Sequence, residues 1–163
     1  MKRLLIAALL AAVPSFAYAK NYAIPKNNPV ATLALPDDWE ADTIDSGVEV
    51  TSKDGEVYIA FETVKAADAK SAVGEAIDYL VSKGVKIDAS SMKTKDGAIN
   101  GMPSTEIDWK GTDKDGDTEI SLIVVVQASK DRLVMLTYWG TPEGGKANED
   151  ALNKIAASIK PIN

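Results

Sequence analysis

The sequence predicts an α+β fold: a mostly antiparallel, twisted sheet with helices on both faces, arranged as an α/β/α sandwich. Two segments, 122–126 and 133–136, are apolar at consecutive positions, so we expect strands that are covered on both faces. Residues 104–110 instead alternate apolar and polar side chains, which indicates a strand with one face in solvent. Two segments with helical periodicity, 69–81 and 146–160, are available to cover the sheet.

The start of the chain has the features of a secretory signal peptide. Lys2 and Arg3 precede an apolar run over residues 4–13, and Ala17-Tyr18-Ala19 is a small-x-small cleavage pattern. The run is about half as long as a membrane-spanning helix. We therefore expect a signal peptide over 1–19 with cleavage after Ala19, which leaves 144 of the 163 residues as an exported, periplasmic protein without membrane insertion.

The composition excludes several classes of protein. The chain contains neither cysteine nor histidine, which rules out Ser-His and Cys-His catalysis, zinc sites built from those ligands and a lipid-bearing cysteine. Loss of Lys2 and Arg3 with the leader would take the net charge from −6 to −8. An acidic chain without a basic cluster is a poor binder of nucleic acid or of an anionic membrane. We expect no nucleic-acid partner and no cofactor.

The first part of the expected mature chain is predicted to be an arm. Residues 20–29 have little apolar content and two prolines, which indicates an extended, mobile segment. Residues 30–163 are expected to form a single domain. A turn at 36–39 and a hairpin at Lys53-Asp54-Gly55, where Asp-Gly supplies the positive φ of a tight turn, separate its first strands. These are predicted at 31–35, 47–52 and 57–63.

The clearest helix is predicted over residues 69–81. Asp68 or Ser71 is expected to cap its first turn, and Gly84 to end it in a left-handed conformation. Its apolar stripe follows the helical spacing and contains Ala69, Val73, Ala76, Ile77, Leu80 and Val81.

A meander of four strands is predicted to follow, at 86–92, 104–110, 117–128 and 132–139. The reversals are expected at Asp96-Gly97, Asn100-Gly101, Asp115-Gly116 and Ser129-Lys130-Asp131. Residues 140–145 are expected to be a flexible connection rather than an anion-binding loop, because the phosphate-loop pattern is missing. The last helix, 146–160, is predicted to place Ala151, Leu152, Ile155 and Ile159 on one face.

The order of these elements and their turns resembles the PsbP/Mog1/DcrB superfamily. The turns that carry the resemblance are Leu35-Pro36-Asp37-Asp38-Trp39, Lys53-Asp54-Gly55, Ile99-Asn100-Gly101-Met102-Pro103 and the final Ser158-Ile159-Lys160. The resemblance implies an α/β/α sandwich and non-enzymatic work, since members include photosystem accessory subunits, a nuclear-transport cofactor, envelope proteins and secretion-effector chaperones. This chain lacks the lipid-bearing cysteine of the phage-sensitivity lipoprotein and the metal-binding histidines of some photosystem members, so only the structural turns carry over.

One acidic segment resembles a calcium loop, because Asp113, Asp115 and Asp117 alternate along the chain. An EF-hand requires glycine at the sixth position and glutamate at the twelfth, where this sequence has Thr118 and Val124. An exposed hairpin tip is therefore favoured, and calcium binding is the weaker alternative.

Four aromatic residues are candidates for binding a partner or ligand: Trp39, Trp109, Tyr138 and Trp139. Exposed aromatic side chains mark binding surfaces because they offer large contact areas at little entropic cost. The alternative is that the rings pack at sheet ends or under a helix, which is favoured for Trp39 and Trp139 because most tryptophan area is buried. Trp109 lies on the alternating strand, on the expected core face.

Two functions are consistent with these features. The favoured one is a soluble periplasmic binding or accessory module, not an enzyme, that acts on an envelope protein or a small ligand. The alternative is a periplasmic hydrolase using carboxylate, serine or lysine chemistry without histidine, cysteine or a transition metal. Such an enzyme requires polar side chains that converge in a concave pocket.

Overall fold

The computed structural model of the chain describes residues 19–126 and 131–162. The strands of its larger sheet are β3 (Glu40–Ile44), β4 (Gly47–Thr51), β5 (Val57–Lys65), β6 (Lys86–Ile99), β7 (Met102–Asp113), β8 (Gly116–Val126) and β9 (Arg132–Gly140). A smaller sheet contains β1 (Ala19–Ile24), β2 (Ala31–Pro36) and β10 (Lys160–Pro161). The helices are α1 (Ala69–Ser82), which a short 3-10 helix η1 (Ala66–Asp68) precedes, α2 (Pro142–Ala147) and α3 (Glu149–Ser158).

Both sheets are antiparallel throughout their described strands. The larger sheet has the order β3-β4-β5-β9-β8-β7-β6, and the smaller one the order β1-β2-β10. The predicted α+β class with a mostly antiparallel sheet is confirmed.

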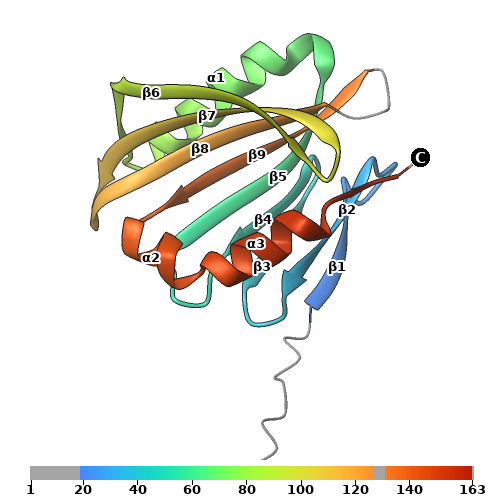
Figure 1. Cartoon of the computed structure of the whole chain (residues 1–163), viewed down its shortest axis with the longest axis horizontal. Coiled ribbons are helices and arrows are strands. Elements are labelled where there is room, and N and C mark those ends of the chain that lie inside the picture. The colour runs from blue at the N-terminus through green and yellow to red at the C-terminus, as the bar shows by residue number, and fades with distance from the viewer. Residues whose placement is uncertain (1–18, 127–130, 163) are drawn as a thin grey trace, which may run out of the picture.

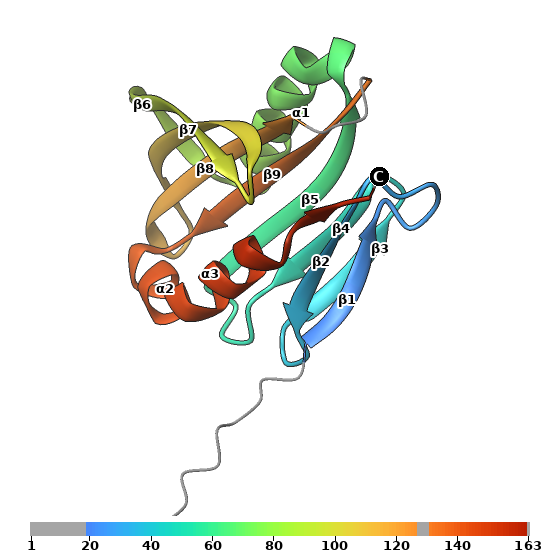
Figure 2. The same ribbon diagram turned by 45° about the vertical axis from the view of Figure 1, so that its right-hand side comes forward.

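The larger sheet is covered on both faces. Helix α1 lies on one face, while α3 and the smaller sheet lie on the other (Figure 1); the turned view separates these layers (Figure 2). Consecutive residues of β8 therefore enter different cores: Leu122 packs beneath α1, and Ile123 packs with α3 and β2. This explains why the strand is apolar at consecutive positions, as the sequence predicts.

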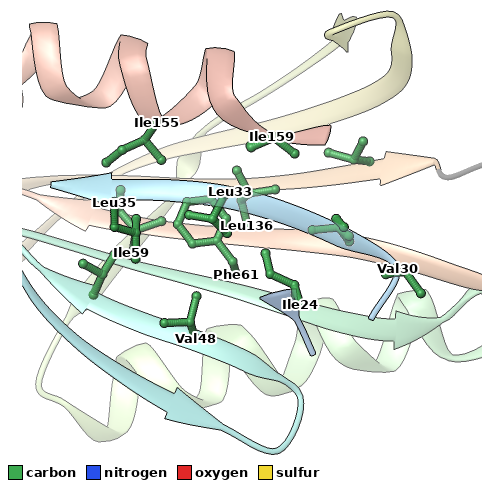
Figure 3. Close-up of a cluster of buried hydrophobic side chains, with 14 of the residues drawn as sticks. Ile24, Val30, Leu33, Leu35, Val48, Ile59, Phe61, Leu136, Ile155 and Ile159 are labelled. Atoms are coloured by element: carbon green, nitrogen blue, oxygen red, sulfur yellow. The ribbon is translucent and has the colours of Figure 1, made fainter. Parts of the chain in front are cut away.

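The larger core fills the space between the sheet, β2 and α3. Phe61 is 1% exposed and lies among Leu33 and Leu35 of β2, Leu136 of β9 and Ile155 of α3 (Figure 3). Alternate residues of β5 and β2 supply most of this cluster, in agreement with the two-residue period of a strand. The sandwich is thus held mainly by apolar contacts between β5, β9, β2 and α3.

The residues expected to form a mobile arm are part of the fold. Strand β1 pairs along its length with β2, and Ile24 is fully buried in the larger core. The backbone of Val30 donates to the Ile24 carbonyl at 2.8 Å, which closes the segment between them. Pairing with the edge of β2 and burial of Ile24 therefore order β1, although the composition of this segment suggests mobility. The predicted leader, apart from Ala19, lies outside the described residues.

Helix α1 presents most of the predicted stripe to the sheet: Ala76 and Leu80 are buried, and Val73 and Ile77 are partly buried against the same core. The prediction for Val81 is wrong, because its side chain is 54% exposed, and Ala72 is buried instead. The expected cap is also wrong, because Asp68 accepts no hydrogen bond through its side chain and Ser71 donates to the Asp68 carbonyl instead. Ala72, Ala76 and Leu80 thus face the sheet, while Val73 and Ile77 lie at the margins of the contact. Gly84 has the predicted left-handed conformation, with φ of 94°.

Of the four reversals predicted for the meander, two are confirmed in the described residues and one is wrong. Asp96-Gly97 does not form a turn: β6 runs through it, and Gly97 pairs with Ser104 of β7. The chain reverses at Asn100-Gly101, where φ is 51° and 82°. The reversal at Asp115-Gly116 is confirmed, and that at 129–131 falls largely outside the described residues.

The C-terminal segment is helical from an earlier point than predicted. Residues 140–145 are not a flexible connection, because α2 begins at Pro142 and the Thr141 hydroxyl accepts from the Gly144 backbone at 2.9 Å. Ile155 and Ile159 are buried as predicted. Strands β3 and β10 were not predicted. Within 19–126 and 131–162, no helix is long and apolar enough to cross a membrane.

Candidate binding groove

A groove of about 340 Å3 lies between α3 and the larger sheet, on the face opposite α1. The side chains of Ile123, Tyr138 and Leu152 are only partly buried there. The lining is mostly apolar and consists of Ile59, Phe61, Glu106, Ser121, Ile123, Leu136, Tyr138, Leu152, Asn153, Ile155 and Ala156. Its lining is more apolar than those of four other pockets in the described part of the chain.

Strand register aligns the groove floor in two rows across the sheet. One row runs from Phe61 through Leu136 and Ile123 to Glu106. The parallel row contains Ile59, Tyr138 and Ser121, and it continues to Asp108, which lies outside the groove lining. Both rows are apolar at β5, where α3 covers them, and carry a carboxyl group at β7. The groove therefore changes from apolar to polar along the direction that crosses the strands.

The carboxyl group at the polar end belongs to Glu106, and Asp108 follows on the same face of β7, just outside the groove lining. The hydroxyl of Ser121 donates to Asp108 Oδ1. Burial raises the pKa of Glu106, and the neighbouring Asp108 raises it further, although Lys95 opposes both effects. Burial also raises the pKa of the Tyr138 hydroxyl at the next strand. The edge of the groove thus offers hydrogen-bonding groups, among them a carboxyl group, that of Glu106, whose pKa is raised.

The raised pKa of Glu106 predicts a pH-dependent effect of Glu106→Gln. Ionisation of this carboxyl is less favourable in the folded chain than in the unfolded one, whose value is 4.5. The wild type therefore loses stability as pH rises through 4.5 and the folded pKa. Urea unfolding should show that Glu106→Gln is more stable than the wild type at pH 7, and that the advantage disappears below pH 4.5. Glu40→Gln, at an exposed position of β3, is the control; an equal pH dependence in both variants would contradict the assignment.

One end of the groove is fixed by the turn between β6 and β7. The side-chain amide of Asn100 donates to the carbonyls of Ala156 at 3.0 Å and Ile159 at 2.7 Å. Carbonyls in the last turn of a helix have no partner within the regular helix; here the Ala156 carbonyl accepts from the Ile159 backbone N–H, and Asn100 adds a second donor. Because Ala156 also lines the groove, this contact holds the β6–β7 hairpin and α3 together at its end.

The four aromatic candidates are not brought together. Trp39 is 7% exposed in the larger core, and Trp109 is 8% exposed beneath α1. Trp139 is half-buried on the α1 face, where its indole donates to Asp113 Oδ2 at 2.9 Å. Only Tyr138 lines the groove. The groove is lined instead by residues that sequence reasoning missed, above all Leu152, Ile123 and Glu106. A binding role for the three tryptophans stays a prediction.

The acidic segment forms the predicted hairpin tip between β7 and β8. Asp113 accepts from the Trp139 indole and from the Asp115 backbone, and Asp115 is paired with Lys114. Asp117 is exposed at the start of β8. In the described part of the chain, no group of three or more Asp, Glu, His or Cys residues is placed to hold a metal ion. Asp113 thus anchors the tip to β9 through Trp139.

Comparison with known proteins identifies the fold. No protein-family model and no curated protein match the sequence. Among solved structures, cyanobacterial PsbP (CyanoP) from Synechocystis has a TM-score of 0.59 at 8% identity, over 94% of this chain and 99% of that one. LpqN of Mycobacterium tuberculosis, described as involved in cell envelope biogenesis, has a TM-score of 0.58 at 12% identity, over 90% and 92%. The Ran-binding protein Mog1p of Saccharomyces cerevisiae has a TM-score of 0.52 at 11% identity, over 88% and 95%.

The shared architecture is an α+β sandwich whose antiparallel sheet is covered on both faces. More particularly, the chain has a PsbP/Mog1-like fold, as the resemblance in its turns predicts. At 8–12% identity, these matches define the fold and nothing about its ligands.

Proposed function

We propose that the chain is an exported, non-enzymatic binding module that holds a small apolar molecule with one polar end in the groove beside α3. The observation that carries this proposal is the change from an apolar floor at β5 and β9 to hydrogen-bonding groups at β7. An elongated ligand would lie across the strands with its apolar part against Leu136 and Ile123. Its polar end would then meet Glu106 and Ser121.

The size of the groove supports a small molecule rather than a protein surface. Its volume of about 340 Å3 is at the lower end of the range of roughly 300–1,000 Å3 typical of ligand pockets. Such pockets combine an apolar lining with a few placed polar groups, which is the composition found here. The contact of Asn100 with the Ala156 carbonyl helps to fix α3, which forms one wall of the groove.

The proposed location is the periplasm. The charged start, the apolar run and the small-x-small pattern of residues 1–19 support export. The mature charge of −8 that follows from removal of Lys2 and Arg3 supports a protein that stays in solution rather than on an anionic membrane. The named roles of the structural neighbours, Ran binding for Mog1p and cell envelope biogenesis for LpqN, support a binding or accessory role.

The test is the binding of a neutral apolar dye, 1-N-phenylnaphthylamine, whose fluorescence rises in apolar sites. We expect saturable binding by the wild type. Leu152→Trp should weaken it at least about tenfold, because the larger side chain fills the groove. Val81→Trp adds the same ring at a position that is 54% exposed on α1, and should leave binding unchanged.

A second groove variant tests the same site in case Leu152→Trp disturbs the fold. Ile123→Gln makes the floor polar and should weaken dye binding as well, with the far-ultraviolet circular dichroism of the wild type retained. Equal binding by the wild type, Leu152→Trp and Ile123→Gln would overturn the proposed site.

The alternative function is a hydrolase, which the pair of carboxyl groups on β7 favours. A carboxyl with a raised pKa beside a second carboxyl is the pattern of an acid and base pair. Against it, Asp108 is engaged by Ser121, and the backbone at this point is paired with β8 rather than free to stabilise an oxyanion. Hydrolysis of chromogenic glycosides or esters that is lost in Glu106→Gln would favour the enzyme.

A further inference from the structure

A second pocket lies on the opposite face of the larger sheet, beneath α1. It has a volume of about 170 Å3 and is separate from the groove beside α3. Its lining residues are Glu49, Tyr58, Ala60, Glu62, Val64, Ala72, Glu75, Ala76, Tyr79, Met135 and Thr137. The proposed function of the groove makes no use of them.

Strand register and two small helix residues create the space. Glu49 of β4, Ala60 of β5 and Thr137 of β9 are directly opposite one another and form one row of the floor. Above the floor, α1 presents Ala72 and Ala76. Because three of these five side chains are alanine, the helix and the sheet do not fill the volume between them.

The pocket is acidic and aromatic. Three carboxyl groups line it, from Glu49, Glu62 and Glu75, and no lysine or arginine of the described chain is among the lining residues. The rings of Tyr58 and Tyr79 lie 6.0 Å apart between their centroids. Carboxylates and the faces of aromatic rings both attract cations.

One ring of this aromatic pair already has an ammonium group as a neighbour. Lys83 Nζ lies 5.0 Å from the centroid of the Tyr79 ring, although Lys83 does not line the pocket. Tyr79 is therefore placed for cation–π contact at the edge of the pocket.

One buried polar group of the floor has no partner. Thr137 is 2% exposed, and its Oγ1 makes no hydrogen bond within the described structure. Thr63 Oγ1 is also buried without a hydrogen-bond partner in the described structure, but Thr63 does not line the pocket. Buried hydroxyl groups are nearly always hydrogen-bonded. The position of Thr137 in the floor indicates that a bound molecule supplies its partner, and an N–H donor from a cation would do so.

The arrangement of the carboxyl groups selects the kind of cation. In the described residues, no three acidic side chains come close enough together to hold a metal ion, so the charges of Glu49, Glu62 and Glu75 are spread around the pocket. A volume of about 170 Å3 is close to a cavity of roughly 150 Å3 that accommodates a benzene-sized molecule. We propose that this pocket binds a small organic cation with a primary alkylammonium group, which contacts Glu49, the tyrosine rings and Thr137 Oγ1.

The experiment is a titration of the isotopically labelled protein with 1,4-diaminobutane, followed by the shifts of backbone amide signals. Butane-1,4-diol is the matched neutral probe. We expect saturable shifts from the diamine at Ala60, Ala72 and Thr137, and none from the diol. A third probe, Nα-acetyl-lysine methylamide, distinguishes a free amine from the lysine side chain of a partner; whichever of the two binds more tightly identifies the source of the same ammonium chemistry.

Variants test the assigned contacts. Glu49→Gln should weaken diamine binding about tenfold, and the isosteric Thr137→Val about fivefold, as expected for loss of a charge-assisted and a neutral hydrogen bond. Thr137→Val removes an unpartnered hydroxyl, so its fold is retained. Glu149→Gln removes a charge from the exposed first turn of α3 and should change nothing. Equal shifts from the diol, no saturable shift from either amine, or equal weakening by Glu149→Gln would each overturn the site.

Discussion

Gly47→Ala is expected to destabilise the protein by about 3 kcal/mol or more, because the fold leaves no room for a side chain there. A Cβ at Gly47 would lie 1.8 Å from the Phe61 carbonyl oxygen, where β4 begins its pairing with β5. The obstacle is backbone, so no rotamer change relieves it. The collision would displace the strand that carries Val48 and Val50 into the larger core.

Gly74→Ala is the matched control. A Cβ at Gly74 meets nothing within 4 Å, and the residue lies inside α1. Alanine there should stabilise the protein by about 0.5–1 kcal/mol, since glycine is a poor helix residue. Urea unfolding of the two variants should therefore move in opposite directions; a Gly47→Ala variant within about 1 kcal/mol of the wild type would show that β4 and β5 do not pair as described.

Phe61→Ala is the second change with a large expected effect, at about 3–5 kcal/mol. Phe61 is 1% exposed and lies at the middle of the larger core, in contact with both layers (Figure 3). Truncation removes the packing that joins β5 to β2 and α3, and it leaves a cavity beneath the groove. Thermal and urea unfolding measure the loss.

Phe61→Leu provides the comparison, because it keeps an apolar side chain of smaller volume. Its cost should be clearly less than that of Phe61→Ala, in line with the smaller cavity. Similar, small costs for both variants would mean that the side chain is not enclosed, and would contradict the position of α3 over β5.

The fold could be predicted from the sequence where the pattern of apolar residues reflects which side chains are buried. The apolar run at 122–126 indicates a strand covered on both faces, and Leu122 and Ile123 do enter different cores. Predictions from single dipeptides were less secure: Asn100-Gly101 forms a turn, yet Asp96-Gly97 continues a strand because its neighbours pair with β7. The local sequence is similar in the two cases, and tertiary pairing decides between them.

The candidate groove could not be predicted in the same way. Ile123, Leu136 and Leu152 have the same apolar character as the residues of the filled core. Whether one of these apolar residues packs in the core or lines the groove depends on how far α3 extends over β8. The local sequence does not indicate that distance. Tyr138 was singled out as an aromatic, whereas Glu106 was interpreted only as the solvent side of an alternating strand. The strand register places Glu106 opposite Ile123, and only this pairing shows that both residues belong to the groove.

The central claim is that the groove beside α3 takes an apolar molecule, and its most direct test is the measurement of intermolecular nuclear Overhauser effects between bound 1-N-phenylnaphthylamine and the protein methyl groups. We expect contacts to the methyl groups of Ile123, Leu136 and Leu152, which line the groove, and none to Leu122 on the α1 face. Contacts confined to Val81 and Met92, which are exposed elsewhere, or spread evenly over the surface, would contradict it.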